Sequence, residues 1–272
     1  MRDGFQSKTK VHKPPASTGK NPVIVLFFGG GFVSGENTML FPTSRALAKM
    51  LGATVIASSY RLAPEHPFPT PVNDCWDSVR WIADNASTLD ADLSAGFVIG
   101  GVSAGAGVAA VVTQMAVTKG MDPRITGLYL GIPMIMTTEL VPEKYRELYL
   151  SWTQLPNSPG LTVADLERAQ AAHNPDINSP WFCPLNAPNP HVGMPPTFLQ
   201  ISGGDVLRDD GLVYARLLQE HGVKTRLVVY PGAPHGYRRQ KQPNIDMLEG
   251  FAWLLGKTVT DEQIQETWPI FA

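Results

Sequence analysis

The chain has 272 residues, 43% of them hydrophobic and 17% charged, and its formal net charge at pH 7 is −2. This length and composition predict a single domain, residues 1–272, with one substantial core. Scattered lysines and arginines argue against nucleic acid or an anionic membrane as a partner. The longest apolar stretch, residues 23–33, is too short to span a bilayer, and the polar start lacks a signal-peptide core. Two cysteines form no disulfide framework, so we expect a cytoplasmic protein.

Strand and helix signals alternate along the chain, which predicts an α/β fold with a mostly parallel central sheet and helices on both faces. The expected strands are 5–12, 23–28, 54–59, 97–100, 125–131, 197–202 and 226–230. The expected helices are 42–51, 72–85, 104–117, 162–172, 211–221 and 245–255. On the second of these helices, the residues interpreted as core packing are Cys75, Trp76, Val79, Trp81 and Ile82.

Residues 133–196 depart from this alternation. The segment is rich in Pro, Asn, Trp and Met, and it contains one clear amphipathic helix, 162–172. An insertion at the carboxyl edge of a sheet is well placed to cover an active site, so we interpret it as a partial lid. The alternative is an ordinary helical connection with long loops.

A strand, a sharp turn and a helix start are predicted around Ser103. The apolar run 97–100 leads into Gly101-Val-Ser103-Ala-Gly105, and small, helix-compatible residues follow. Glycines on both sides let strand and helix approach closely and push the serine hydroxyl outward, as in a nucleophile elbow. A small-residue turn is the alternative, because G-x-S-x-G also arises by chance.

A nucleophilic serine needs a histidine and an acid later in the chain. Asp205 follows the strand expected at 197–202, and His235 follows the strand expected at 226–230. The chain order Ser103, Asp205, His235 is the order of α/β-hydrolases.

Three glycines, Gly29 to Gly31, follow the buried strand at 23–28. They expose backbone N–H groups with no side chain in the way, which suits an anionic tetrahedral intermediate. A flexible turn is the alternative.

The remaining polar residues receive structural interpretations. Asp209 and Asp210 are alternatives to Asp205, but we expect them to cap the helix that follows. His66 is expected to pack or hydrogen-bond within its proline-rich segment. The histidines expected on the surface or in loops are His12, His173, His191 and His221. No cluster has the spacing of metal ligands, so no metal is predicted.

From about residue 3 to residue 253, the chain resembles the hormone-sensitive-lipase-like, carboxylesterase-like family of α/β-hydrolases. Besides the motifs above, the stretch Tyr60-Arg-Leu-Ala-Pro-Glu-His-Pro-Phe-Pro69 is close to a family signature. The resemblance implies an α/β-hydrolase fold in which Ser103 is the nucleophile, His235 the general base and acid, and Asp205 its orienting partner. It also implies that the oxyanion donors are the N–H groups of Gly30, Gly31 and Ala104.

The chain departs from the family pattern in three places. Phe28 stands where the family has the histidine of His-Gly-Gly-Gly, and around the elbow the chain has Val102, Ala106 and Gly107. The usual N-terminal cap helices and first strand are not seen before residue 3. We therefore expect a more open active site, or one completed by a second subunit in a homodimer.

These observations predict a serine carboxylesterase that hydrolyses small to medium hydrophobic esters through an acyl-enzyme, without a cofactor. Within the family, fungal-type esterases of secondary metabolism are most similar in style. One alternative is a lyase or cyclase that acts on a metabolite in the same pocket, which Phe28 favours. Another is a ligand receptor, which the retention of Ser103, Asp205 and His235 disfavours.

Overall fold

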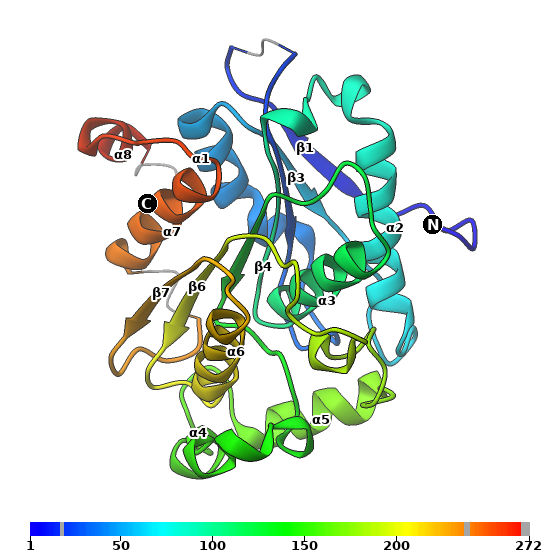
Figure 1. The fold of residues 1–272 in the computed structure, drawn as a ribbon, viewed down its shortest axis with the longest axis vertical. Helices are drawn as coiled ribbons and strands as arrows, with labels where there is room; N and C mark the ends of the chain where they lie inside the picture. The colour runs from blue at the N-terminus through cyan, green and yellow to red at the C-terminus, as the bar shows by residue number, and fades with distance from the viewer. Residues whose placement is uncertain (17–18, 237–239, 268–272) are drawn as a thin grey trace.

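The computed structural model describes residues 1–16, 19–236 and 240–267. Its centre is a seven-stranded sheet in the order β1-β3-β2-β4-β5-β6-β7 (Figure 1). β1 pairs with β3 in antiparallel fashion, and the other pairs are parallel. The strands are β1 Thr9–His12, β2 Val23–Phe27, β3 Thr54–Ser58, β4 Phe97–Val102, β5 Gly127–Gly131, β6 Thr197–Ser202 and β7 Thr225–Tyr230. The mostly parallel sheet predicted from the sequence is confirmed.

Helices cover both faces of the sheet, with α1 and α7 on one side and α2 and α3 on the other (Figure 1). The α-helices are α1 Phe41–Leu51, α2 Thr70–Asp84, α3 Ala104–Thr118, α4 Ser151–Gln154, α5 Val163–His173, α6 Arg208–Glu220, α7 Lys241–Leu254 and α8 Asp261–Thr267. Short 3-10 helices are η1 Asn37–Leu40, η2 Ala86–Leu89, η3 Leu93–Ala95, η4 Thr138–Leu140, η5 Glu143–Leu148 and η6 Pro184–Asn186.

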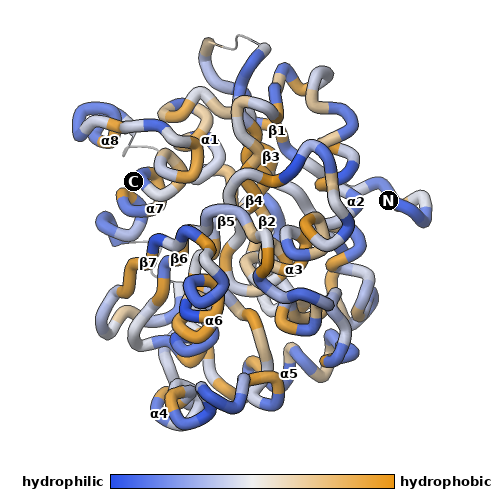
Figure 2. Tube along the Cα trace, viewed as in Figure 1, coloured by the Kyte–Doolittle hydropathy of each residue, from blue (hydrophilic) through white to orange (hydrophobic). Residues whose placement is uncertain are grey.

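The core follows from the composition of the central elements. Every residue of β2, β3 and β5 is buried, which is typical of parallel strands that helices cover on both faces. α3 is apolar all round and is buried from its start through residue 116. Figure 2 shows hydrophobic residues along the central strands and in α3, and hydrophilic residues toward the outer surface.

Several details differ from the prediction, among them the short helix α4, which was not expected. Trp76, Val79 and Ile82 are buried on α2, but Trp81 is 55% exposed, because its position lies on the opposite side of the helix from Val79. β1 begins at Thr9 and not at Phe5. α8 was not predicted, because its short, polar sequence buries only Ile264 and Thr267 among its described residues and shows no apolar period.

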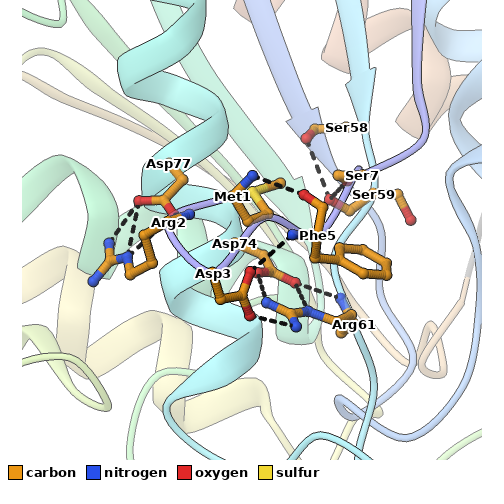
Figure 3. Close-up of polar contacts among 10 residues, drawn as sticks. All are labelled: Met1, Arg2, Asp3, Phe5, Ser7, Ser58, Ser59, Arg61, Asp74 and Asp77. Carbon is orange, nitrogen blue, oxygen red and sulfur yellow. Dashed lines mark hydrogen bonds and ion pairs between the residues drawn. The ribbon is translucent and has the colours of Figure 1, made fainter.

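An ionic network ties the N-terminal segment to α2 and to the loop after β3 (Figure 3). The Arg61 guanidinium donates to both oxygens of Asp74, at 2.8 and 2.7 Å, and pairs with Asp3 at 2.7 Å. Nearby, Arg2 pairs with Asp77 at 2.6 Å. Asp74 is only 1% exposed, so its charge depends on Arg61 for compensation.

We expect Arg61→Met to lower the free energy of unfolding by about 2 to 3 kcal/mol, because it leaves a buried carboxylate unpaired. Arg2→Met removes a cation from the more exposed pair and is the matched control, with an expected loss below about 1 kcal/mol. Urea unfolding followed by tryptophan fluorescence measures both values. Equal losses in the two variants would contradict the structural role assigned to Asp74.

Candidate active site

Ser103 occupies a tight turn between β4 and α3. Its φ of 56° and ψ of −123° place it in a region that residues other than glycine rarely adopt, and surrounding contacts must impose such a conformation. Ser103 N donates to Gly131 O at 2.8 Å. A Cβ at Gly105 would lie 2.3 Å from Phe27 O, so only glycine lets α3 start this close to β2.

The structure brings the predicted serine, histidine and aspartate into one line of hydrogen bonds. His235 Nε2 lies 3.0 Å from Ser103 Oγ, and His235 Nδ1 lies 2.7 Å from Asp205 Oδ2. Ser103 is 8% exposed and Asp205 is 1% exposed. A proton on Nδ1, held by the carboxylate, leaves Nε2 as an acceptor for the serine hydroxyl. The geometry is that of an activated serine.

Asp205 and His235 meet because they follow neighbouring parallel strands, β6 and β7, whose carboxyl ends lie at the same edge of the sheet. Backbone hydrogen bonds join the two loops: Gly204 N donates to Ala233 O at 2.9 Å. Asp205 Oδ1 accepts from Leu207 N at 3.0 Å, which fixes the carboxylate. The loops therefore position the pair before any substrate binds.

The glycine loop lies directly against the elbow. A Cβ at Gly29 would be 3.0 Å from Ser103 Cβ, and Gly30 and Gly31 line the same cleft as Ser103. Within the described residues, the N–H groups of Gly30 and Gly31 donate to no other group. The N–H of Ala104 begins α3, where no intrahelical acceptor exists. Three N–H donors are thus free beside the serine, and their role as an oxyanion hole stays a prediction.

Phe28 is buried behind the glycine loop. Its ring stacks on Tyr60, with centroids 4.2 Å apart and planes 5° from parallel. The Tyr60 hydroxyl also donates to Phe28 O at 2.7 Å. Phe28 is not among the residues that line the cleft, so its position favours support of the loop over contact with a substrate. Tyr60 opens the 60–69 signature, which gives that sequence a physical role here.

Asp210 does not cap α6, so that prediction is wrong. It lies in the first turn of α6, but its Oδ2 accepts from the backbone N–H groups of Ile135 and Met136, at 2.8 and 3.1 Å. The Tyr149 hydroxyl donates to the other oxygen. Burial raises the pKa of Asp210 to about 7. Asp210 therefore fastens one part of segment 133–196 to the sheet domain.

Asp209 also binds that segment and not its own helix. Its Oδ2 accepts from the backbone N–H groups of Leu150 and Ser151, both at 2.7 Å, at the start of α4. Arg208 pairs with the same carboxylate at 2.7 Å. These hydrogen bonds and this cation hold the pKa of Asp209 below its usual range despite burial. The sequence could not show that another segment would supply the donors.

Two of the other histidines, His173 and His66, differ from their predictions. His173 is buried at the end of a helix; His191 lies in a turn, as predicted, but is buried too, and burial lowers the pKa of each of these two to about 4. His66 is exposed, so it does not pack within the proline-rich stretch. His173 ends α5 and stacks on Phe32, with centroids 4.2 Å apart. It is therefore a residue of the predicted lid segment that packs beside the end of the glycine loop.

An open cleft of about 680 Å³ surrounds Ser103 and His235, within the usual size of small-molecule sites. α5 forms one wall through Asp165, Arg168, Ala169 and Ala172. Arg168 and Asp165 pair with each other, so this wall presents little net charge. Gly160, which precedes α5 in segment 133–196, lies close to the backbone of His235.

No helix in residues 1–16, 19–236 and 240–267 is both long and apolar enough to cross a membrane. Over the same residues, no three His, Cys, Asp or Glu side chains gather in a way that could hold a metal ion.

Comparison with known proteins places the chain in a family. A family profile described as an alpha/beta hydrolase fold matches residues 24–239. Carboxylesterase NlhH of Mycobacterium tuberculosis H37Rv is 33% identical over 242 residues, covering 84% of this chain and 70% of that protein. Vibralactone cyclase superposes with a TM-score of 0.87 at 30% identity, covering 93% of this chain and 78% of that one.

A bacterial heroin esterase superposes with a TM-score of 0.83 at 28% identity, covering 92% of this chain and 80% of that chain. The range of the family profile, residues 24–239, includes strands β3 to β7 and contains Ser103, Asp205 and His235. The chain belongs to the α/β-hydrolase fold family, in its carboxylesterase-like branch.

Proposed function

We propose that the protein is a serine carboxylesterase, and the hydrogen-bonded line of Ser103, His235 and Asp205 is the observation that carries this proposal. Ser103 Oγ attacks the ester carbonyl carbon while its proton moves to His235 Nε2. The tetrahedral intermediate then expels the alcohol, which takes that proton. Water then attacks the acyl-enzyme and gives its proton to His235; collapse of the second tetrahedral intermediate releases the acid, and His235 returns the proton to Ser103 Oγ.

The negative oxygen of each tetrahedral intermediate would accept from the N–H groups of Gly30, Gly31 and Ala104. Donors fixed before the reaction lower the barrier because no reorganisation accompanies charge development. Buried Phe28, stacked on Tyr60, supports the loop that presents two of the three. Similarity to carboxylesterases and to a bacterial heroin esterase supports ester hydrolysis as the reaction.

The substrate is an ester with small to medium hydrophobic parts. The open cleft and its neutral α5 wall support this class, since a buried net charge would favour ionic substrates. Segment 133–196 acts as a partial lid, held by Asp209 and Asp210 and lining the cleft through α5. Three further points stay predictions: that the protein forms a homodimer, that it acts in secondary metabolism, and that it is cytoplasmic. The two buried free thiols suggest the last of these.

The second candidate is an intramolecular acyl transfer, which the similarity to vibralactone cyclase favours. In that reaction a hydroxyl of the substrate replaces water as the acceptor of the acyl group. The two reactions differ in their products: in H₂¹⁸O, hydrolysis places the heavy oxygen in the released acid, and cyclisation places none in the product.

An active-site-directed fluorophosphonate tests the proposal. We expect stoichiometric labelling of Ser103, located by peptide mass mapping, because only a serine activated by its neighbours reacts quickly. Ser103→Ala should abolish the labelling, and heat-unfolded protein should not react. Labelling at another serine, or none in the folded protein, would reject the assigned nucleophile.

A further inference from the structure

A small, mostly apolar cavity lies beside the cleft that holds Ser103. It measures about 50 Å³, which gives room for a few atoms of a short chain. Gly31 and Ala169, which pack against each other, line both the cavity and the cleft, so the two spaces are adjacent at this pair. The apolar lining comes mainly from α3, α5 and the segments around them: Phe32, Val108, Met134, Leu166, Trp181 and Phe182.

The position of His235 decides which half of an ester enters this cavity. The departing alcohol must receive its proton from His235 Nε2, and His235 lines the open cleft but not the cavity. The alcohol half therefore stays in the cleft. With the carbonyl oxygen at Gly30 and Gly31, the acyl chain is the half of the ester that remains to extend from the Gly31 and Ala169 side of the cleft toward the cavity.

His173 provides a polar group in this apolar space. It lines the cavity, is 3% exposed and stacks on Phe32. Its buried Nδ1 has no hydrogen-bond partner among the described residues. A buried polar atom without a partner costs about 1 to 3 kcal/mol, which a ligand that supplies the partner would recover.

Two other buried polar atoms of cavity-lining residues, Trp152 Nε1 and Thr137 Oγ1, also have no hydrogen-bond partner among the described residues. Each has a polar neighbour that does not line the cavity, the Tyr149 hydroxyl for Trp152 and the Glu139 carboxylate for Thr137. Gln170 also borders a second, more open groove. Because burial lowers the pKa of His173 to about 4, its ring is neutral at pH 7 and suits a neutral oxygen rather than a carboxylate.

We propose that this cavity selects esters of short acids whose chain carries a neutral oxygen, a hydroxyl or a ketone, that hydrogen-bonds to His173. The inference rests on the proposed esterase function and names the acid half of its substrate. A neutral imidazole can donate through one nitrogen and accept through the other, so both kinds of oxygen are matched.

The test compares two matched pairs of phenyl esters: 4-oxopentanoate with pentanoate, and 3-hydroxybutanoate with butanoate. For each ester, kcat/KM is divided by the rate of spontaneous hydrolysis, which removes differences in intrinsic reactivity. We expect the oxygenated member to be favoured about tenfold in at least one pair, the size of one well-made hydrogen bond.

Two variants of His173 and one control variant test whether that preference for the oxygenated ester depends on His173. His173→Phe keeps an aromatic ring beside Phe32 and should bring the ratio to about one, mainly by slowing the oxygenated ester. His173→Gln keeps a neutral donor and acceptor and should restore part of the preference. His191→Phe is the matched control, because His191 is equally buried with an unpartnered Nδ1 but lines neither the cavity nor the cleft, and its ratios should equal those of the parent.

The outcomes separate the two proposals. Hydrolysis of all four esters without a preference in the parent, or a preference that His173→Phe leaves intact, overturns the acyl selectivity while the esterase function stands. Absence of hydrolysis of every ester by the parent overturns both.

Discussion

Ser103→Ala and His235→Ala should each lower the turnover of phenyl acetate by about three or more powers of ten. Alanine at position 103 removes the attacking oxygen. Alanine at position 235 removes the base that lies 3.0 Å from that oxygen and the acid that protonates the alcohol. The residual rate comes from substrate binding and from backbone N–H donors that both variants retain.

Purified variants should be compared with the parent by steady-state kinetics, with circular dichroism to show that they are folded. His66→Ala is the control for His235→Ala, because His66 is exposed and does not line the cleft. Its turnover should match that of the parent. Near-parental turnover of either Ser103→Ala or His235→Ala would mean that another residue carries the reaction.

The sequence predicts the fold and the site well wherever local residue chemistry and the periodicity of apolar residues determine the structure. The buried strands read as apolar runs, and the glycines around Ser103 mark a close approach that leaves no space for a Cβ. The sequence predicts that Ser103, Asp205 and His235 lie close together in space, because each follows a predicted strand of one parallel sheet. Their loops must then lie at the same edge.

Prediction fails where a partner comes from a distant segment. Asp210 looks like a helix cap, but Ile135 and Met136, far away in the sequence, supply the donors. His173 looks like a polar helix end, and it is buried because Phe32 and Phe182 close around it. These contacts depend on how segment 133–196 folds over the sheet, and its irregular composition carries no periodic signal.

The Asp209 and Asp210 contacts also explain how the irregular segment 133–196 is held in place. Most of segment 133–196 is not in regular secondary structure, so its backbone N–H groups need other acceptors. Two adjacent carboxylates at the start of α6 supply them at two separate points of the segment. A single helix terminus therefore anchors two points of the segment that contains α5, the helix that lines the cleft.

Asp205→Asn should lower the turnover of phenyl acetate by about three powers of ten and leave the fold intact. The asparagine keeps the size of the side chain and one oxygen, which can still accept from Leu207 N. Facing His235, however, the amide nitrogen donates to Nδ1 and forces the proton onto Nε2. The ring then cannot accept the proton of Ser103, and no carboxylate balances the imidazolium.

Asp209→Asn is the matched control, four residues along the same segment. Its carboxylate holds Leu150 and Ser151 and does not touch His235, so the variant should lose stability, by about 1 to 3 kcal/mol, and keep most of its turnover per folded molecule. Urea unfolding and active-site titration, measured on both variants, separate the two effects. If both variants are folded and lose activity equally, Asp205 is not the acid that orients His235.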